Sequence, residues 1–166
     1  KNFFLKNQKN QPWYYEMQEL GYHYRSTDIQ CALGISQLKK INKFLAKRKK
    51  IAKYYDYEFA SLKNATPLQI YKRDYSSNHL YILLINFSKI NITKTELINK
   101  LRKVGINTQV HYIPITHHPF YKKKNLKSRL IQTENYYKKA LSIPIFYDLK
   151  TKEQQHIVHH IKKIIK

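Results

Sequence analysis

The sequence predicts an α/β fold in which packed helices cover a small sheet. Residues 79–87, HLYILLINF, form a dense apolar run of strand length that is rich in aromatic and β-branched side chains. A helical pattern follows from Thr93 to Gly105, and residues 106–113 form a second extended run that ends before Pro114. A strand, a helix and a second strand at this spacing indicate one α/β layer around one core.

Length and composition agree with a single folded domain. The chain has 166 residues, of which 42% are hydrophobic, and this excludes a disordered tail. The single cysteine, Cys31, excludes an intrachain disulfide and fits a reducing compartment. The sequence has neither the roughly 20 consecutive apolar residues of a membrane-spanning helix nor a secretion signal at its start, so we expect a cytoplasmic protein with no membrane partner. Because the chain starts at Lys1, we also expect a piece of a longer polypeptide.

The first elements are a linker and a long helical segment. Residues 1–11 indicate an exposed linker, and the aromatic residues 13–15 either stack on a base or, as we favour, pack under a loop. Ser26 or Thr27 can cap a helix that starts there, with Asp28 in its first turn. The pattern extends to about Leu62, with a break near residues 40–42. Its buried stripe is expected to contain Ile29, Cys31, Leu33, Gln37, Ile41, Phe44, Leu45, Ile51, Ala52, Tyr55, Phe59 and Leu62.

Shorter elements are expected in the rest of the chain. A loop around Pro67 precedes a short strand at residues 68–71, and residues 79–87 should form the buried central strand. Thr93 and Glu96 have capping-box spacing, and Gly105 suits the end of that helix.

The last part of the chain should add two helices and one further strand. A basic run at residues 122–127 leads into a helix that ends near Leu141. Residues 142–145 indicate an edge strand or an extended turn, because Pro144 cannot donate to a ladder. The last helix starts after Thr151, with Glu153 near its start.

The chain is strongly basic. Thirty-two Lys and Arg against ten Asp and Glu give a formal net charge of +22. Such a charge is typical of proteins that bind nucleic acid or an anionic membrane surface. The lysines are scattered over nearly every expected helix, so a solvated surface explains them equally well. For the basic stretch at residues 47–50 we favour a solvated face over a nucleic-acid-binding helix. A diphosphate substrate would also benefit from positive steering.

Two groups of polar residues are candidates for a site. His156, His159 and His160 share a helix, but the H-E-x-x-H spacing is missing and a zinc site needs further ligands, so we expect no metal. The second group runs from the end of an expected strand into a loop, where ligands of α/β layers usually bind, and indicates an anion- or sugar-binding edge. It consists of Gln109, His111, Tyr112, Thr116, His117, His118 and Tyr121.

Several motifs together resemble one family. Residues 21–38 show the pattern G-Y-x-Y-R-x-x-D-I-Q-x-A-L-G-x-x-Q-L, followed by S-S-N-H-L-Y at 76–81, Q-V-H-Y-I-P at 109–114 and L-S-I-P at 141–144. In this order they resemble the C-terminal part of sugar aminotransferases of the DegT/DnrJ/EryC1/StrS family. The second and third motifs are most similar to members on the pathway to pseudaminic acid.

The resemblance implies a fold and a reaction. Members are fold-type I, aspartate aminotransferase-like enzymes that use pyridoxal 5'-phosphate, and this chain would be their C-terminal small domain. The intact homodimer would transfer an amino group from glutamate to C4 of a UDP-linked 4-keto-6-deoxy sugar. The Schiff-base lysine of the family lies upstream of the G-Y-x-Y-R motif, so we expect this chain alone to be inactive. The implied parts are a linker at 1–19, a helical segment at the domain and dimer interface at 20–62, and the small domain at 63–166.

The resemblance also assigns candidate residues. His23 matches the position that contacts the cofactor phosphate of the neighbouring subunit, and Gln109, Val110, His111 and Tyr112 match the segment that lines the nucleotide-sugar site. No catalytic residue and no metal ligand is implied in this chain. Two positions depart from the family pattern, because His23 replaces the usual Asn and Thr116 stands where many members have the first His of H-x-H-P. The alternatives to an aminotransferase are a small basic nucleic-acid-binding protein and a non-catalytic sugar-nucleotide binder.

Overall fold

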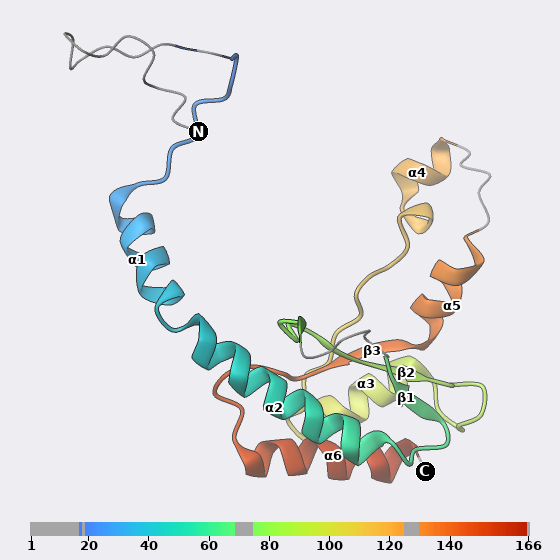
Figure 1. Ribbon diagram of the computed structural model, residues 1–166. Helices are drawn as coiled ribbons and strands as arrows, with labels where there is room; N and C mark the ends of the chain where they lie inside the picture. The colour runs from blue at the N-terminus through green and yellow to red at the C-terminus, as the bar shows by residue number, and fades with distance from the viewer. Residues whose placement is uncertain (1–16, 18, 69–74, 125–129, 166) are drawn as a thin grey trace, which may run out of the picture. The chain divides into compact units, whose positions relative to one another are not determined.

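The structure is a computed structural model that describes residues 17, 19–68, 75–124 and 130–165 (Figure 1). The chain divides into two compact units, Lys1–Lys39 and Lys40–Lys166. Three predictions lie wholly or partly outside the described residues: the linker at 1–11 with the aromatic cluster at 13–15, most of the short strand at 68–71, and part of the basic run at 122–127.

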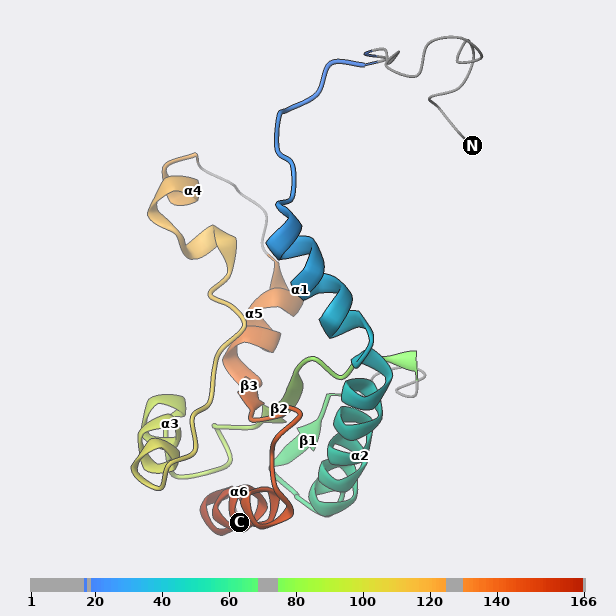
Figure 2. The same cartoon turned by 90° about the vertical axis from the view of Figure 1, so that its left-hand side faces the viewer.

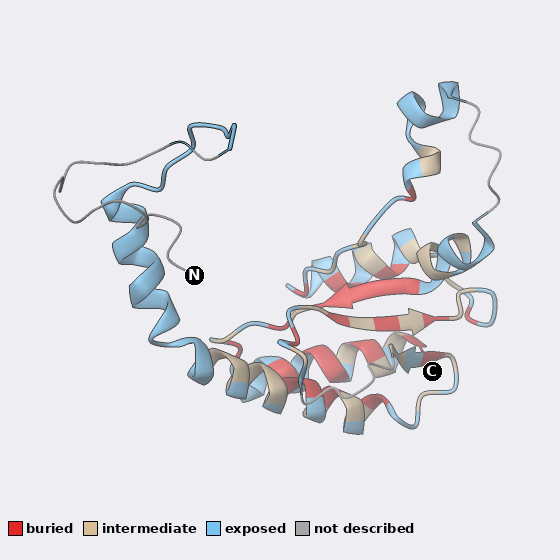
Figure 3. Ribbon diagram, turned by 45° about the horizontal axis from the view of Figure 1, so that its top comes forward, coloured by how far each residue is buried: buried red, intermediate tan, exposed pale blue. Residues whose placement is uncertain are grey.

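The first unit contains α1, Asp28–Leu38. Thr27 is the N-cap: its hydroxyl accepts a hydrogen bond from Gln30 N–H at 3.3 Å, and the Gln30 side chain accepts one from Thr27 N–H at 2.9 Å. This capping box confirms the predicted helix start. The predicted buried stripe is wrong for α1, because all of its residues, including Cys31, are exposed (Figure 3). Helical periodicity identifies the apolar side of a helix but not what packs against it. In the part of the chain that the structure describes, no segment buries the apolar residues of α1.

The second unit starts with α2, Ile41–Phe59, so the predicted break falls at residues 39–40. Four residues of the expected stripe are buried, namely Ile51, Ala52, Tyr55 and Phe59. Their three- and four-residue spacing places them on one side of the helix, and this side packs into the core with the sheet. Arg48, in the basic stretch, bonds the His79 ring at 3.3 Å, so this part of α2 is more than a solvated face.

The described residues form a three-stranded antiparallel sheet in the order β1-β2-β3, from Ala65–Pro67, Tyr81–Ile85 and Ala140–Ile143. The central position of β2 confirms that prediction, although only alternate residues of β2 are fully buried. β1 occupies the region around Pro67 where a loop was expected. Proline is tolerated there because β1 is an edge strand, and the ladder continues when Leu68 N–H donates to the Ile82 carbonyl at 2.9 Å.

The predicted strand at residues 106–113 is wrong. Its one ladder contact is an isolated bridge between Gln109 and Ser142, and the neighbour of β2 is instead β3. The helix before β3 is α5, Ile131–Lys139. It ends two residues before the predicted Leu141, because β3 already starts at Ala140. The expectation of an edge strand near residue 142 is confirmed, with β3 starting two residues earlier.

The predicted caps of α3, Lys94–Lys103, are confirmed. Thr93 and Glu96 form a capping box, and Gly105 has a φ of +79°. Gly105 N–H donates to Arg102 O at 3.0 Å and Ile106 N–H to Leu101 O at 2.9 Å, which is a Schellman motif. The predicted last helix is also confirmed as α6, Thr151–Ile165. Two short helical segments were not predicted, η3 (Ile115–His117) and α4 (Pro119–Lys123).

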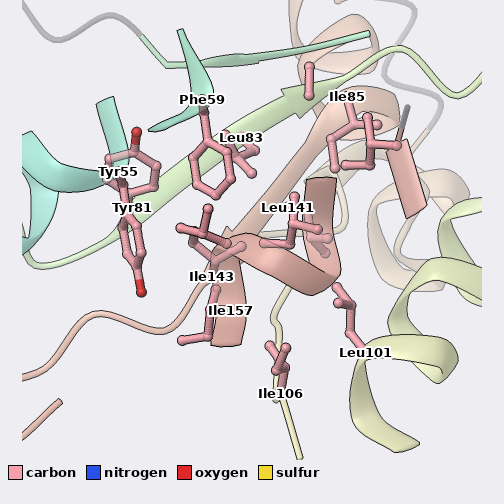
Figure 4. Close-up of a cluster of buried hydrophobic side chains, with 14 of the residues drawn as sticks. Tyr55, Phe59, Tyr81, Leu83, Ile85, Leu101, Ile106, Leu141, Ile143 and Ile157 are labelled. Atoms are coloured by element: carbon pink, nitrogen blue, oxygen red, sulfur yellow. The ribbon is translucent and has the colours of Figure 1, made fainter. Parts of the chain in front are cut away.

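One core unites the second unit. Buried side chains of α2, α3 and α6 join those of the sheet, and Figure 2 shows α6 end-on between α2 and α3. Tyr55, Phe59 and Tyr81 form its aromatic part, with the Tyr55 and Tyr81 ring centroids 5.0 Å apart (Figure 4). Both phenols are satisfied, since Tyr55 donates to Pro144 O at 3.0 Å and Tyr81 to Asp56 Oδ1 at 2.8 Å. This core fixes β3, which positions the candidate site.

Candidate functional site

The candidate substrate segment, Gln109 to Tyr112, is attached to β3 by backbone and side-chain bonds. Gln109 N–H donates to Ser142 O at 3.1 Å, and Ser142 N–H donates to Gln109 O at 2.8 Å. The His111 ring then spans the two residues, with Nδ1 2.8 Å from Ser142 Oγ and Nε2 3.0 Å from Gln109 Oε1. Ser142 is buried, so the imidazole is anchored to the core.

The partners of His111 select its tautomer. An amide oxygen only accepts, so Nε2 carries the hydrogen and donates to Gln109. In the neutral ring Nδ1 is then an acceptor, and the Ser142 hydroxyl donates to it. Both ring nitrogens are thus occupied within the chain, which orients the ring.

The other residues of the segment divide between core and solvent. Val110 is half-buried and packs against the hydrophobic core, so it holds the backbone in place. Gln109 is exposed, and Tyr112 is 74% exposed. An exposed tyrosine ring beside oriented polar groups can stack on a sugar or a base and donate through its hydroxyl. The segment therefore offers a polar, aromatic edge.

The polar residues beyond the buried Pro114 have different environments. Thr116 is half-buried, while His118 and Tyr121 are exposed. His117 Nε2 lies 2.7 Å from Glu134 Oε1, and its ring contacts Tyr137 with a centroid distance of 5.8 Å. Ser142 and Glu134 were not predicted as the partners of His111 and His117, because each lies many residues away from its histidine. A weak signal for Glu134 is that it is one of only ten acidic residues in the chain.

His23 belongs to the first unit and lies in an exposed segment before α1. Its neighbours Tyr22 and Tyr24 are 91% and 81% exposed, with ring centroids 6.1 Å apart. The imidazole is accessible and can donate one hydrogen bond to an anion. Its contact with a cofactor phosphate stays a prediction.

The three histidines of α6 contact one another. The ring centroids of His156 and His160 are 4.4 Å apart, and those of His159 and His160 are 5.2 Å apart. Desolvation, together with the two neighbouring histidines and Lys163, lowers the pKa of His160. His156 Nε2 donates to Val104 O at 2.9 Å, which ties α6 to the end of α3. Within the described part of the chain, no group of three or more His, Cys, Asp or Glu could hold a metal ion.

Two pockets lie away from the candidate segment. One of about 600 Å³ is formed by the turn after α3, the stretch from Pro144 to Leu149 and the first half of α6. The other, of about 420 Å³, lies where β2, α3 and α5 meet and is lined by Lys94, Lys138 and Lys139 among others. Residues 109–112 line neither of these two pockets. No helix within the described ranges has the length and apolar character needed to span a membrane.

Comparisons with known proteins agree with the sequence resemblance. The DegT/DnrJ/EryC1/StrS aminotransferase family model matches residues 1–162. A UDP-4-amino-4,6-dideoxy-N-acetyl-beta-L-altrosamine transaminase of Campylobacter jejuni is 40% identical over 149 residues, which is 90% of this chain and 39% of that protein. The Helicobacter pylori protein of the same name is 36% identical over 148 residues, 89% of this chain and 39% of that protein.

Solved structures give the same result. Helicobacter pylori PseC, an aminotransferase involved in the biosynthesis of pseudoaminic acid, superimposes with a TM-score of 0.81 at 32% identity, covering 98% of this chain and 43% of that one. DesV of S. venezuelae shares the fold with a TM-score of 0.78 at 20% identity, covering 90% of this chain and 39% of its own. The predicted α/β fold class is thereby confirmed. The chain spans about 40% of the length of the relatives it matches.

Proposed function

The chain belongs to the DegT/DnrJ/EryC1/StrS aminotransferase family, and we propose that it is the C-terminal small domain of a nucleotide-sugar transaminase. The whole enzyme transfers an amino group from glutamate to C4 of a UDP-linked 4-keto-6-deoxy sugar on a pathway to pseudaminic acid. The observation that carries this proposal is the 40% identity over 149 residues to a transaminase named for a UDP-4-amino sugar. None of the comparisons supports the alternative of a nucleic-acid-binding protein.

The role of this chain is to bind and orient the UDP-sugar. Gln109 and Tyr112 are exposed, and they contact the ligand directly. His111 is held by Ser142 and Gln109, so it keeps the side chain of Gln109 in place and presents the edge of its ring. Val110 holds the backbone of the segment against the core. Because these contacts within the chain already orient the segment, little conformational entropy is lost on binding.

The residues of this chain fit one contact with the cofactor and do not form a whole cofactor site. His23 is exposed and can donate to the phosphate of pyridoxal 5'-phosphate held by the neighbouring subunit. When bound, that cofactor supplies an electron sink for amino transfer. The Schiff-base lysine of the family belongs upstream of the G-Y-x-Y-R motif, so the chemical step lies outside this chain.

The assembled enzyme is a cytoplasmic homodimer. The exposed apolar face of α1 supports this part of the proposal, since such faces usually mark protein contacts. In the proposed division into a linker at 1–19, an interface segment at 20–62 and the small domain at 63–166, α2 of the interface segment packs into the core of the small domain. The net charge of +22 would steer a UDP-linked substrate towards the protein.

The test is amino transfer by the protein expressed from its whole reading frame. Incubated with glutamate and a UDP-4-keto-6-deoxy sugar, it should form 2-oxoglutarate and the UDP-4-amino sugar in equal amounts, measured by mass spectrometry. Replacement of Tyr112 by Ala should raise the KM for the sugar substrate and leave the KM for glutamate unchanged. A folded, cofactor-loaded protein that makes neither product contradicts the proposal.

A further inference from the structure

Residues 109–118 form the loop that carries the candidate substrate segment, Gln109 to Tyr112. This loop has a second attachment point at His117. Its Nε2 lies 2.7 Å from Glu134 Oε1, and its ring meets that of Tyr137 edge-on at an interplanar angle of 87°. Glu134 and Tyr137 are three residues apart on α5, so they lie on the same side of that helix. One face of α5 thus holds the imidazole through both a charged acceptor and an aromatic ring.

This contact does not depend on the charge of the imidazole. An ionised carboxylate only accepts hydrogen bonds, so Nε2 must carry the hydrogen, and it does so in the cation and in one neutral tautomer. With Nε2 and one side of the ring occupied, His117 is poorly placed to bind a substrate. His117 therefore serves to attach the loop to α5, and this explains why it occurs among the polar residues that follow Gln109.

The helix that holds His117 is itself fixed to the core. Lys94, the first residue of α3, donates through Nζ to the backbone carbonyls of Tyr137 and of Ala140, the latter at 3.3 Å. The last carbonyls of a helix lack intrahelical donors, so this ammonium completes the C-terminal end of α5. Lys94 also lies over the Tyr137 ring, 5.0 Å from its centroid. Tyr137 is thus held between Lys94 and His117.

We propose that Glu134 and Tyr137 are positioning residues, which hold His117 on α5 and thereby fix the conformation of the loop that presents Gln109 to Tyr112. The loop is then attached at both ends, to Ser142 on β3 at one end and to α5 at the other. A loop fixed at both ends has fewer conformations to lose when a ligand binds. The identity of that ligand rests on the proposed function, whereas the attachment does not.

Amide hydrogen exchange of the whole protein tests the attachment without catalysis. His117 N–H donates to Pro114 O at 2.9 Å and His118 N–H to Ile115 O at 3.0 Å, so both amides report on the end of the loop. Glu134→Ala should speed their exchange about fivefold, in proportion to a lost charge-assisted bond that is partly exposed. Glu134→Gln keeps an accepting oxygen and should restore most of the protection. Tyr137→Leu removes the ring contact and should speed exchange at the same two amides.

The matched control is Glu58→Ala. It removes another short ion pair, from Lys162 Nζ to Glu58 Oε2 at 2.6 Å, which joins α6 to α2 away from the loop. This variant should leave the exchange of His117 and His118 unchanged. Equal exchange in wild type and Glu134→Ala, or an equal rise in Glu58→Ala, overturns the proposal.

Steady-state kinetics test the functional consequence. In Glu134→Ala the KM for the UDP-sugar should rise about fivefold while the KM for glutamate stays unchanged, because only the loop conformation is altered. Faster exchange with an unchanged sugar KM overturns the positioning role. If the wild-type protein does not transfer amino groups to UDP-sugars, the proposed function fails, and the exchange result still decides whether Glu134 and Tyr137 fix the loop.

Discussion

Tyr55 is the residue on which the aromatic part of the core depends. Its ring contacts those of Phe59 and Tyr81, at centroid distances of 5.8 and 5.0 Å, and its hydroxyl donates to the Pro144 carbonyl. Tyr55→Phe keeps the ring contacts and removes the hydrogen bond. We expect the free energy of unfolding at pH 7 to fall by about 1 kcal/mol, measured by urea denaturation. An unchanged midpoint would show that the bond contributes nothing net.

The same residue should make stability depend on alkaline pH. Burial raises the pKa of Tyr55 above its ordinary value of 10.0, because the folded protein cannot solvate the phenolate. Its contribution is therefore fully present below pH 10 and decreases as the pH rises above 10, where the unfolded chain ionises first. The slope of unfolding free energy against pH above 10 should be smaller in Tyr55→Phe than in wild type. Equal slopes contradict the assignment to Tyr55.

His23 is the sharpest residue-level test of the proposed cofactor contact. Asn, the usual family residue, donates through its amide, and a neutral imidazole donates through one ring N–H. In the whole enzyme His23→Ala should weaken retention of pyridoxal 5'-phosphate by about ten- to a hundredfold, the usual range for losing a bond to a charged group. His23→Asn should retain most of the affinity. Equilibrium dialysis measures both, and indifference to both changes means that His23 is only a loop residue.

The site shows why residue types are easier to predict than residue pairs. Gln109, His111 and Tyr112 were predicted as site residues because polar and aromatic residues cluster next to an extended run, and this assignment stays a prediction. Their partner Ser142 lies 31 residues from His111, and Glu134 lies 17 from His117. Such pairings are created by the packing of β3 and α5, so no local pattern contains them.

Among the elements, helix ends were the most predictable. Thr27, Thr93 and Gly105 act through bonds within a few residues, which the sequence spells out directly. The strand expected at residues 106–113 failed because its apolar residues pack individually against the core, as Ile106 and Val110 do, while β3 takes the place beside β2. A short extended run and a true strand have the same local composition.

Gly105 allows a clean test of the α3 terminus. Its φ is +79°, and an added Cβ would meet no atom within 4 Å, so the whole cost of Gly105→Ala is conformational. We expect a loss of about 1 kcal/mol in the free energy of unfolding. The control is Gly34→Ala in the middle of α1, where the added methyl also meets nothing and φ is ordinary, and where helicity by circular dichroism should rise or stay constant. A neutral Gly105→Ala would show that this turn relaxes freely.

For the molecule as a whole, the proposal that the Schiff-base lysine lies outside this chain predicts how the chain reacts with pyridoxal phosphate. Lys94 is the lysine of most interest, because burial lowers its pKa and a neutral amine is nucleophilic. Its Nζ is occupied by the Tyr137 and Ala140 carbonyls, however. We expect pyridoxal phosphate and borohydride to label the 166-residue chain weakly and over several lysines, as mapped by mass spectrometry. Stoichiometric labelling at one lysine contradicts this expectation.

The state of association is the final property that depends on the whole chain. Along α1 the residues Ile29 and Leu33, which are four apart and share one side of the helix, are 83% and 61% exposed, although the helix is capped and regular. A face of this kind is stable in water when another surface covers it. The net charge of +22 opposes self-association and should weaken it at low salt.

We therefore expect the chain to associate, and to do so more strongly as salt rises, measured by sedimentation velocity over a range of protein concentrations. Leu33→Glu places a charge in the middle of the apolar face and should shift the chain towards monomer. Tyr57→Glu is the matched control. Tyr57 is 80% exposed on α2, so this substitution adds the same charge away from α1. A monodisperse monomer at every concentration and salt would show that the apolar face of α1 does not drive self-association, and it would remove the support that this face gives to the proposed dimer.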